Sequence, residues 1–338
     1  MADMSGGKQD WLSERLRENF WRIWQELNQA DTPKDYFNLE GGSVEQVRDM
    51  RLRFHHCANY AAALTILQER LVPSEQKGIP PQGRNGGVEG QGNLHILELG
   101  CGGGALTFAF ARVMPSGWQL LAADYSEQLI DYAQKVRRAE NLRFQRVEIN
   151  NLDIGFLNDV DGVMFLEVIE HLPQKVVRNL LCHLYQGLRP GGLVIISTLD
   201  RSPFRRGFSG YPPHWIEYRY ETLSGFLTDK SNNPFEVLKI FRLGSEKIVR
   251  AAVRAEEMGG YFVNRLNGLV KRFAKKYAGF NFCQERLGAV FFRLYSRIPF
   301  KMDFGIEGYV NELYFINEGE TDDKSSFSLV AVLRKEGK

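Results

Sequence analysis

The sequence has few cysteines, no long apolar run and no marked excess of charge of either sign. Cys57, Cys101, Cys182 and Cys283 are widely spaced, so they form neither a disulfide framework nor a zinc-binding pattern. No apolar stretch reaches the roughly eighteen residues that a membrane-spanning helix needs. The first residues, MADMSGGKQDW, also lack the basic and apolar regions of a secretory signal. These absences predict a reduced, cytoplasmic protein.

The length of 338 residues exceeds one average domain, whereas 43% hydrophobic and 25% charged residues are ordinary for a soluble globular protein. The N-terminal part carries apolar residues at helical spacing, among them Phe20, Ile23, Trp24 and Leu27. Composition and periodicity divide the chain into five parts. They are an N-terminal helical cap (1–72), a flexible linker rich in Gly, Pro, Gln and Ser (73–93), an α/β core (94–243), a basic helical insertion (244–310) and closing β-strands of the core (311–338).

The core alternates short apolar runs with segments of helical periodicity. This alternation predicts a mostly parallel sheet with right-handed crossovers and helices on both faces. We therefore expect a Rossmann-like α/β fold with a seven-stranded sheet. The expected strands cover residues 95–99, 119–124, 143–149, 162–166, 193–198, 235–241 and 326–334.

A glycine-rich loop follows the first expected strand, in the sequence ILELGCGGG of residues 96–104. Gly100, Gly102 and Gly104 lack the Cβ atoms that would block a sharp turn and a close ligand. The helix expected from Ala105 directs its free N–H groups towards that loop. The spacing also satisfies the Gly-x-Gly-x-x-Gly/Ala pattern of dinucleotide-binding folds, so glycine alone leaves the cofactor open.

Two carboxylates favour one cofactor. Glu98 precedes the loop at the end of a buried strand, where an unpaired charge is costly. A pyrophosphate would repel Glu98, whereas the amino group of S-adenosylmethionine would pair with it. Asp124 ends the second strand twenty positions after Gly104, which suits hydrogen bonds from the two ribose hydroxyls of an adenosine.

The sequence E-L-G-C-G-G-G of residues 98–104 resembles motif I of the class I S-adenosylmethionine-dependent methyltransferases. The resemblance implies that residues 94–243 form an S-adenosylmethionine-binding core and that the last strand, 326–334, inserts antiparallel. It also implies that residues after the third strand contact adenine. In this chain, Asn150 and Asn151 follow the third strand, and the Gly-Asp that is usual there in the family is absent. The further residues expected to bind the cofactor are Tyr125, Asn150, Asn151 and Leu166.

A second group of polar residues follows the fourth strand. Glu167, Glu170 and His171 lie at its carboxyl end, where open α/β sheets bind ligands. They share one face if a helical turn begins there, and His214 in the loop after the fifth strand reaches the same edge. Two carboxylates and imidazole suit Mg²⁺, Mn²⁺ or Zn²⁺.

The Glu-x-x-Glu-His element resembles two groups of methyltransferases. It is similar to the O-methyltransferases of ubiquinone biosynthesis, although Asp200 replaces the asparagine usual in the following strand. It is also similar to the small-RNA 3′-terminal 2′-O-methyltransferases, which implies that Glu167, Glu170, His171 and His214 are metal ligands. Many small-molecule methyltransferases carry such a sequence without a metal, and His171 would then accept the hydroxyl proton.

The C-terminal insertion differs from the rest of the chain in charge. Residues 239–301 contain fourteen Lys and Arg but four Glu, whereas the whole chain has 43 basic and 41 acidic residues. Basic helices with interleaved apolar residues contact anionic membranes or phosphates. The alternative is a solvated face on a lid over the pocket. The overall balance is weak evidence against an RNA enzyme.

These features lead to three functional hypotheses. The first is an O-methyltransferase that acts on a hydroxylated small molecule, such as an aromatic compound, a quinone precursor or a polyketide-like metabolite. The second is metal-dependent 2′-O-methylation of an RNA 3′ end. The third is a non-catalytic protein that binds S-adenosylmethionine, which the polar residues at the cleft argue against.

Overall fold

The computed structural model describes residues 5–29, 50–71, 93–149, 157, 159–205, 214–254, 306–316 and 325–337. Its strands are β1 (His95–Leu99), β2 (Gln119–Asp124), β3 (Leu142–Arg146), β4 (Gly162–Leu166), β5 (Leu193–Leu199), β6 (Glu236–Gly244), β7 (Tyr314–Ile316) and β8 (Ser326–Arg334). Its helices include α1 (Ser5–Gln29), α2 (Met50–Leu71), α3 (Ala105–Val113), α4 (Glu127–Val136), the short 3₁₀ helix η6 (Ile169–His171), α5 (Gln174–Gly187), α6 (Tyr220–Thr228) and α9 (Ile306–Val310).

The strands form one mixed sheet in the order β3-β2-β1-β4-β5-β8-β6-β7. The five strands from β3 to β5 pair in parallel, and β8 inserts antiparallel between β5 and β6. The expected Rossmann-like fold and the antiparallel last strand are therefore confirmed. The sheet has eight strands in the described part of the chain, not seven, because β7 pairs with the end of β6. A three-residue strand is too short for a periodic sequence signal.

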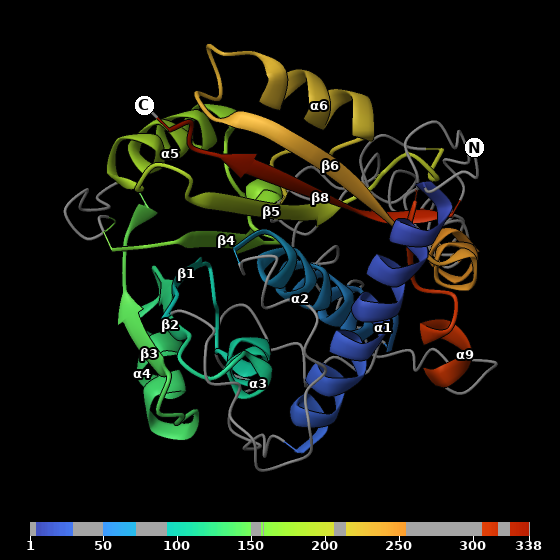
Figure 1. Ribbon diagram of the computed structural model, residues 1–338, viewed down its shortest axis with the longest axis horizontal. Helices are drawn as coiled ribbons and strands as arrows, with labels where there is room; N and C mark the ends of the chain where they lie inside the picture. Colours follow the sequence, from blue (N-terminus) through green and yellow to red (C-terminus); the bar gives the residue numbers. More distant parts are fainter. Residues whose placement is uncertain are drawn as a thin grey trace, which may run out of the picture.

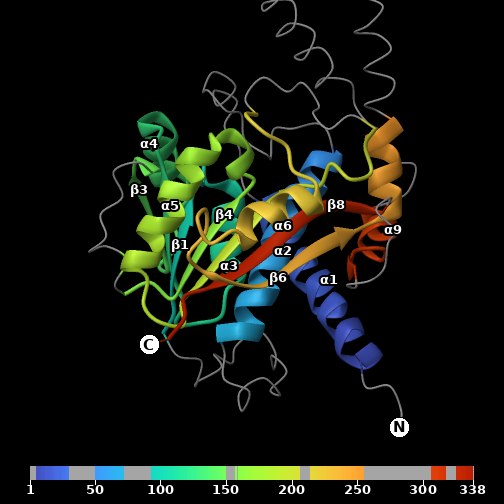
Figure 2. The same ribbon diagram turned by 90° about the horizontal axis from the view of Figure 1, so that it is seen from above.

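Two helical layers cover the sheet. Figure 1 shows α5 and α6 on one side of the strands and α1, α2 and α3 on the other. Side chains alternate along β4, where Val163 and Phe165 pack towards α5 while Met164 and Leu166 pack towards α2 and α3. The view from above in Figure 2 again places α1 and α2 away from α5. The strands β1, β2 and β4 therefore have a buried core on each face, and their carboxyl ends lie between these two cores.

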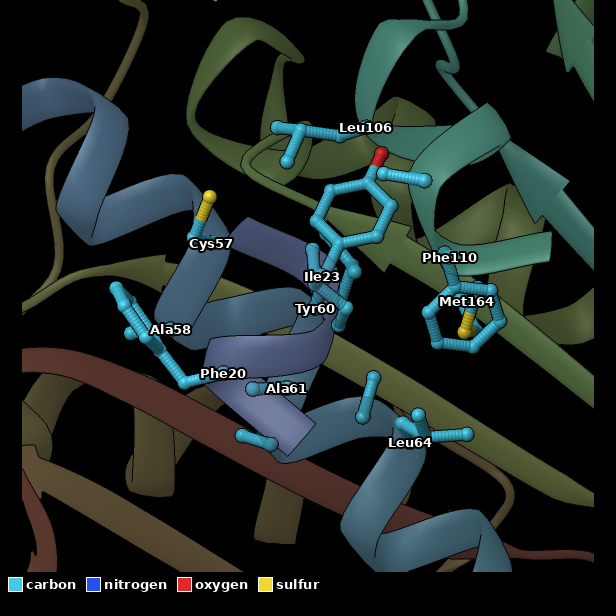
Figure 3. Close-up of a cluster of buried hydrophobic side chains, with 14 of the residues drawn as sticks. Phe20, Ile23, Cys57, Ala58, Tyr60, Ala61, Leu64, Leu106, Phe110 and Met164 are labelled. Carbon is cyan, nitrogen blue, oxygen red and sulfur yellow. The ribbon is translucent and has the colours of Figure 1, made fainter. Parts of the chain in front are cut away.

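The helices expected to form an N-terminal cap share a core with the sheet. The predicted stripe of Phe20, Ile23, Trp24 and Leu27 on α1 is buried, and α2 is buried along most of its length. Figure 3 shows residues of α1, α2 and α3 packed together beside Met164 of β4. The α2 helix thus lies directly against the strands that carry the candidate site.

Several sequence expectations differ from the structure or fall outside it. The third strand ends at Arg146 and not at 149, and the sixth continues to Gly244. Most of the expected linker, and residues 255–305 of the basic insertion, lie outside the described residues. Membrane or phosphate contact through that insertion therefore stays a prediction. None of the described helices combines the length and apolar character needed to cross a membrane.

Candidate active site

The glycine loop between β1 and α3 turns through left-handed backbone. Gly102 and Gly104 have φ values of +55° and +72°. A Cβ at Gly104 would lie 2.5 Å from the Phe144 ring, so glycine is required there for packing. A Cβ at Gly102 would meet no atom within 4 Å. The backbone at Gly102 therefore borders open space, as a loop that approaches a ligand must.

Asp124 fixes this loop to the end of β2. Its carboxylate accepts hydrogen bonds from the Gly102 N–H, at 2.9 Å, and from the Ser126 N–H, at 3.0 Å. Ser126 also caps α4 by accepting from the Leu129 N–H. Each carboxylate oxygen has acceptor capacity left for a further donor. The predicted cofactor residue Tyr125 is next in the chain, and 70% of its surface is exposed.

Glu98 is buried in β1 beneath the glycine loop. The Tyr60 hydroxyl of α2 donates a hydrogen bond to Oε1 of Glu98. The other oxygen, Oε2, is buried without a hydrogen-bond partner among the described residues. Burial raises the pKa of Glu98 to about 7, although the hydroxyls of Tyr60 and Thr107 beside it act in the opposite direction. The unpaired oxygen is a candidate partner for a cationic ligand group.

The other predicted cofactor residues are placed unevenly. Leu166 is buried at the end of β4. Val168 packs against the glycine loop, because a Cβ added at Gly100 would lie 2.5 Å from its Cγ2 atom. Asn150 and Asn151 lie outside the described residues. The donor loop and the polar element after β4 are therefore in contact.

Glu167 is held away from solvent by residues of α2 and β5. Its Oε2 lies 2.8 Å from His55 Nε2, and its Oε1 accepts hydrogen bonds from Asn59 Nδ2, at 2.8 Å, and Ser197 Oγ, at 2.9 Å. Burial alone would raise the pKa of Glu167, but the neighbouring His55 lowers it to about 2. Its φ of 60° is unusual for a residue with a side chain.

Glu170, His171 and His214 converge as the sequence predicted. One ligand atom from each of the three lies within 4.8 Å of the others. The two imidazole rings are edge to face, with centroids 4.7 Å apart. Thr198 Oγ1 donates to Glu170 Oε2 at 3.0 Å. The fourth predicted ligand, Glu167, is outside this cluster among the described residues, and its oxygens bond His55, Asn59 and Ser197, although it lies close enough to Glu170 to raise the pKa of that carboxyl.

Hydrogen bonds and ion pairs connect the segment after His214 to this cluster. The Trp215 N–H donates to the Glu170 carbonyl at 2.7 Å. His214 Nδ1 lies 2.6 Å from Glu217 Oε1, and the other oxygen of Glu217 lies 3.2 Å from Arg201 Nε. Both carboxylate and guanidinium are buried. A carboxylate on one imidazole nitrogen directs the other nitrogen towards a metal or substrate.

The electrostatics of the cluster suit a cation. Burial and then the nearby Glu167 carboxylate raise the pKa of Glu170 well above its ordinary range. Two imidazoles and one carboxylate match the donor set of three-ligand zinc sites, and they also suit Mn²⁺. The arrangement that fixes His214 through Glu217 fits the same role. The residues present therefore fit a divalent ion, whereas metal binding itself stays a prediction.

Several residues of the site were not predicted from the sequence, and they are His55, Asn59, Tyr60, Ser197, Thr198, Arg201 and Glu217. One signal for the first three was present, because these polar residues lie four and five positions apart among apolar residues of α2. Nothing in the sequence showed which strand this face meets. Glu217 follows His214 by three positions, a spacing that also occurs in exposed turns.

Residues 97–194 match the family model described as a methyltransferase domain. This stretch is a methyltransferase domain. The domain includes the glycine loop, Asp124 and the Glu-x-x-Glu-His element, so the predicted methyltransferase class is confirmed for the domain. The helices α1 and α2 and the strands β6 to β8 lie outside the matched stretch.

Similar proteins carry related names. The chain is 30% identical over 110 residues to a ubiquinone biosynthesis O-methyltransferase of Xanthomonas campestris pv. campestris (strain B100), which covers 32% of this chain and 44% of the relative. It is also 30% identical over 151 residues to the protein of that name from Rickettsia typhi (strain ATCC VR-144 / Wilmington), and this match covers 43% of this chain and 58% of the relative. The chain thus spans about half the length of these relatives.

The solved structures that match this chain are more distant in sequence. A coclaurine N-methyltransferase bound to N-methylheliamine and SAH is 16% identical, with a TM-score of 0.47, and the match covers 96% of this chain and 91% of that chain. Phosphoethanolamine N-methyltransferase 2 of Haemonchus contortus is 14% identical, with a TM-score of 0.40, and the match covers 72% and 49%.

Proposed function

We propose that this protein transfers the methyl group of S-adenosylmethionine to a hydroxyl oxygen of a small molecule. The observation that carries the proposal is the convergence of Glu170, His171 and His214 at the carboxyl end of β4, next to the glycine loop. Donor and acceptor must meet at such a point for direct displacement. The names of the relatives support an oxygen acceptor, although the match covers only part of those proteins.

The donor side is formed by three features of the chain. Gly102 offers open backbone, and Asp124 keeps acceptor capacity for ribose hydroxyls. Glu98 keeps one unpaired buried oxygen for the amino group of the donor. S-adenosylmethionine supplies an electrophilic methyl group on a sulfonium centre. These side chains bind and orient it, and the two cores exclude water from the floor of the site.

The acceptor side rests on the three-residue cluster. Glu170, His171 and His214 would hold a divalent ion such as Zn²⁺, Mn²⁺ or Mg²⁺, which lowers the pKa of a bound hydroxyl. In a metal-free site His171 accepts the hydroxyl proton. A catechol-like ring has two adjacent hydroxyls that would suit such an ion, so this is the acceptor class that we propose. Aromatic quinone precursors and polyketide-like metabolites belong to this chemical class.

The test uses purified full-length protein, S-adenosylmethionine and catechol. We expect a monomethyl ether and S-adenosylhomocysteine in equal amounts by mass spectrometry. The Glu170→Gln variant should lower kcat by about 100-fold, whereas Glu236→Gln, an exposed carboxylate on β6, is the matched control.

Three results would change the proposal. Full turnover in EDTA would reject the metal, and His171→Ala should then remove activity. Methylation of an RNA oligonucleotide at its 3′-terminal ribose, without any reaction of catechol, would replace the small molecule by RNA. No product with either acceptor, despite binding of S-adenosylmethionine, would favour a non-catalytic role.

A further inference from the structure

The α2 helix places polar side chains against two carboxylates of the sheet. His55 and Asn59 contact Glu167 after β4, and Tyr60 contacts Glu98 in β1. Glu98 belongs to the donor part of the proposed site, and Glu167 lies beside its acceptor part, three positions before Glu170. The matched methyltransferase stretch begins at residue 97, so α2 is not part of it.

Tyr60 is held firmly in the core. Its ring lies edge to face with Phe110 of α3, with centroids 5.9 Å apart. Figure 3 shows Tyr60 among apolar residues of α1, α2 and α3. On the adjacent position of α2, Asn59 Oδ1 accepts a hydrogen bond from Ser328 Oγ of β8 at 2.7 Å. These contacts fix α2, so the Tyr60 hydroxyl has little freedom to move away from Glu98.

We propose that Tyr60 is a positioning residue of the methyl-donor site. It holds Oε1 of Glu98 so that Oε2 remains directed to the amino group of S-adenosylmethionine, which makes α2 a wall of the cofactor pocket. The inference rests on the proposed function, because it assumes that Glu98 receives this amino group.

The physical reason is the cost of a buried charge. A carboxylate that has lost its hydroxyl donor is more expensive to keep ionised in the core. It must nevertheless be ionised to pair well with an ammonium group. The pKa of Glu98 is already raised to about 7 by burial, so loss of a hydrogen bond that favours the ionised form shifts the carboxyl further towards its neutral form. Removal of the Tyr60 hydroxyl should therefore weaken binding of the donor without any direct contact between Tyr60 and the donor.

The test is calorimetric titration of the full chain with S-adenosylhomocysteine, which keeps the amino group and needs no acceptor. We expect Tyr60→Phe to weaken binding by about tenfold. In a Glu98→Gln background the same substitution should change the affinity by less than about threefold, because the charge is gone. The matched control is Tyr314→Phe. This substitution removes a hydroxyl that donates a hydrogen bond to Ser325, and its strand, β7, is five strands away from β1 in the sheet.

The outcomes separate this inference from the proposed function. Wild-type affinity in Tyr60→Phe, or the same loss in the Glu98→Gln background, would overturn the role of Tyr60 while the methyltransferase proposal stands. No binding of S-adenosylhomocysteine or S-adenosylmethionine by the wild type would overturn both. Thermal unfolding of each variant checks the fold, and a purely structural role of Tyr60 would lower Tm and leave the affinity unchanged.

Discussion

The donor and acceptor halves of the site are built in different ways. The donor half uses β1, the glycine loop, β2 and Tyr60 of α2, and the hydrogen bonds described there join residues no more than 38 positions apart. The acceptor half joins α2, β4, β5, β8 and the loop that carries His214. The difference shows why a short motif identifies a cofactor, whereas the acceptor site depends on the complete fold.

Within the donor half, Gly104 and Gly102 differ in what surrounds them, so substitutions there have different expected effects. Gly104→Ala should lower the free energy of unfolding by about 4 kcal/mol, because a Cβ there combines left-handed backbone with a clash against Phe144. Gly102→Ala should lower the free energy of unfolding by about 1 kcal/mol, because the added Cβ strains the backbone but meets no neighbouring atom. The same substitution should weaken the binding of S-adenosylhomocysteine by about 100-fold. Urea unfolding and calorimetry measure both. Equal loss of stability in the two variants would contradict the distinction.

The pH dependence of stability tests the burial of Glu98 in the ligand-free protein. Its pKa is raised from 4.5 to about 7, so the folded state binds a proton that the unfolded state releases. Stability is therefore fully present below pH 4.5 and falls as the pH rises to about 7, by about 3 kcal/mol in total.

The measurement is the difference in unfolding free energy between wild type and Glu98→Gln across that pH range. Other titrating groups cancel in this difference. A difference that stays constant with pH would show that Glu98 is not buried as described, and it would weaken the contrast between the two halves.

In the acceptor half, Glu217 provides the smallest expected effect. Glu217→Gln should lower the affinity for Zn²⁺ about tenfold, because the buried carboxylate orients His214. Competition with a chromophoric chelator measures this change. Glu221→Gln, on the exposed face of α6, is the control and should bind as the wild type does. Tighter or unchanged binding in Glu217→Gln would show that the Glu217–His214 contact does not organise the cluster.

The sequence predicted the features that depend on local patterns. Alternating apolar runs located the parallel strands, and the glycine spacing located the donor loop. The convergence of Glu170, His171 and His214 was also predictable, since carboxyl ends of neighbouring strands meet at one edge. The position of Glu167 was not, because its partners His55 and Asn59 lie on a helix more than a hundred positions earlier. Helical periodicity shows that α2 has a polar side but not which carboxylates it meets.

The position of β8 has a consequence for how the protein reaches its active form. Ser326–Arg334 is inserted between β5 and β6, although it comes after both in the chain. Until this strand arrives, β5 and β6 expose unpaired backbone edges that favour aggregation. Ser328 of the same strand also secures Asn59. During synthesis, the donor loop has all its parts early, whereas the acceptor half is complete when the last strand has closed the sheet.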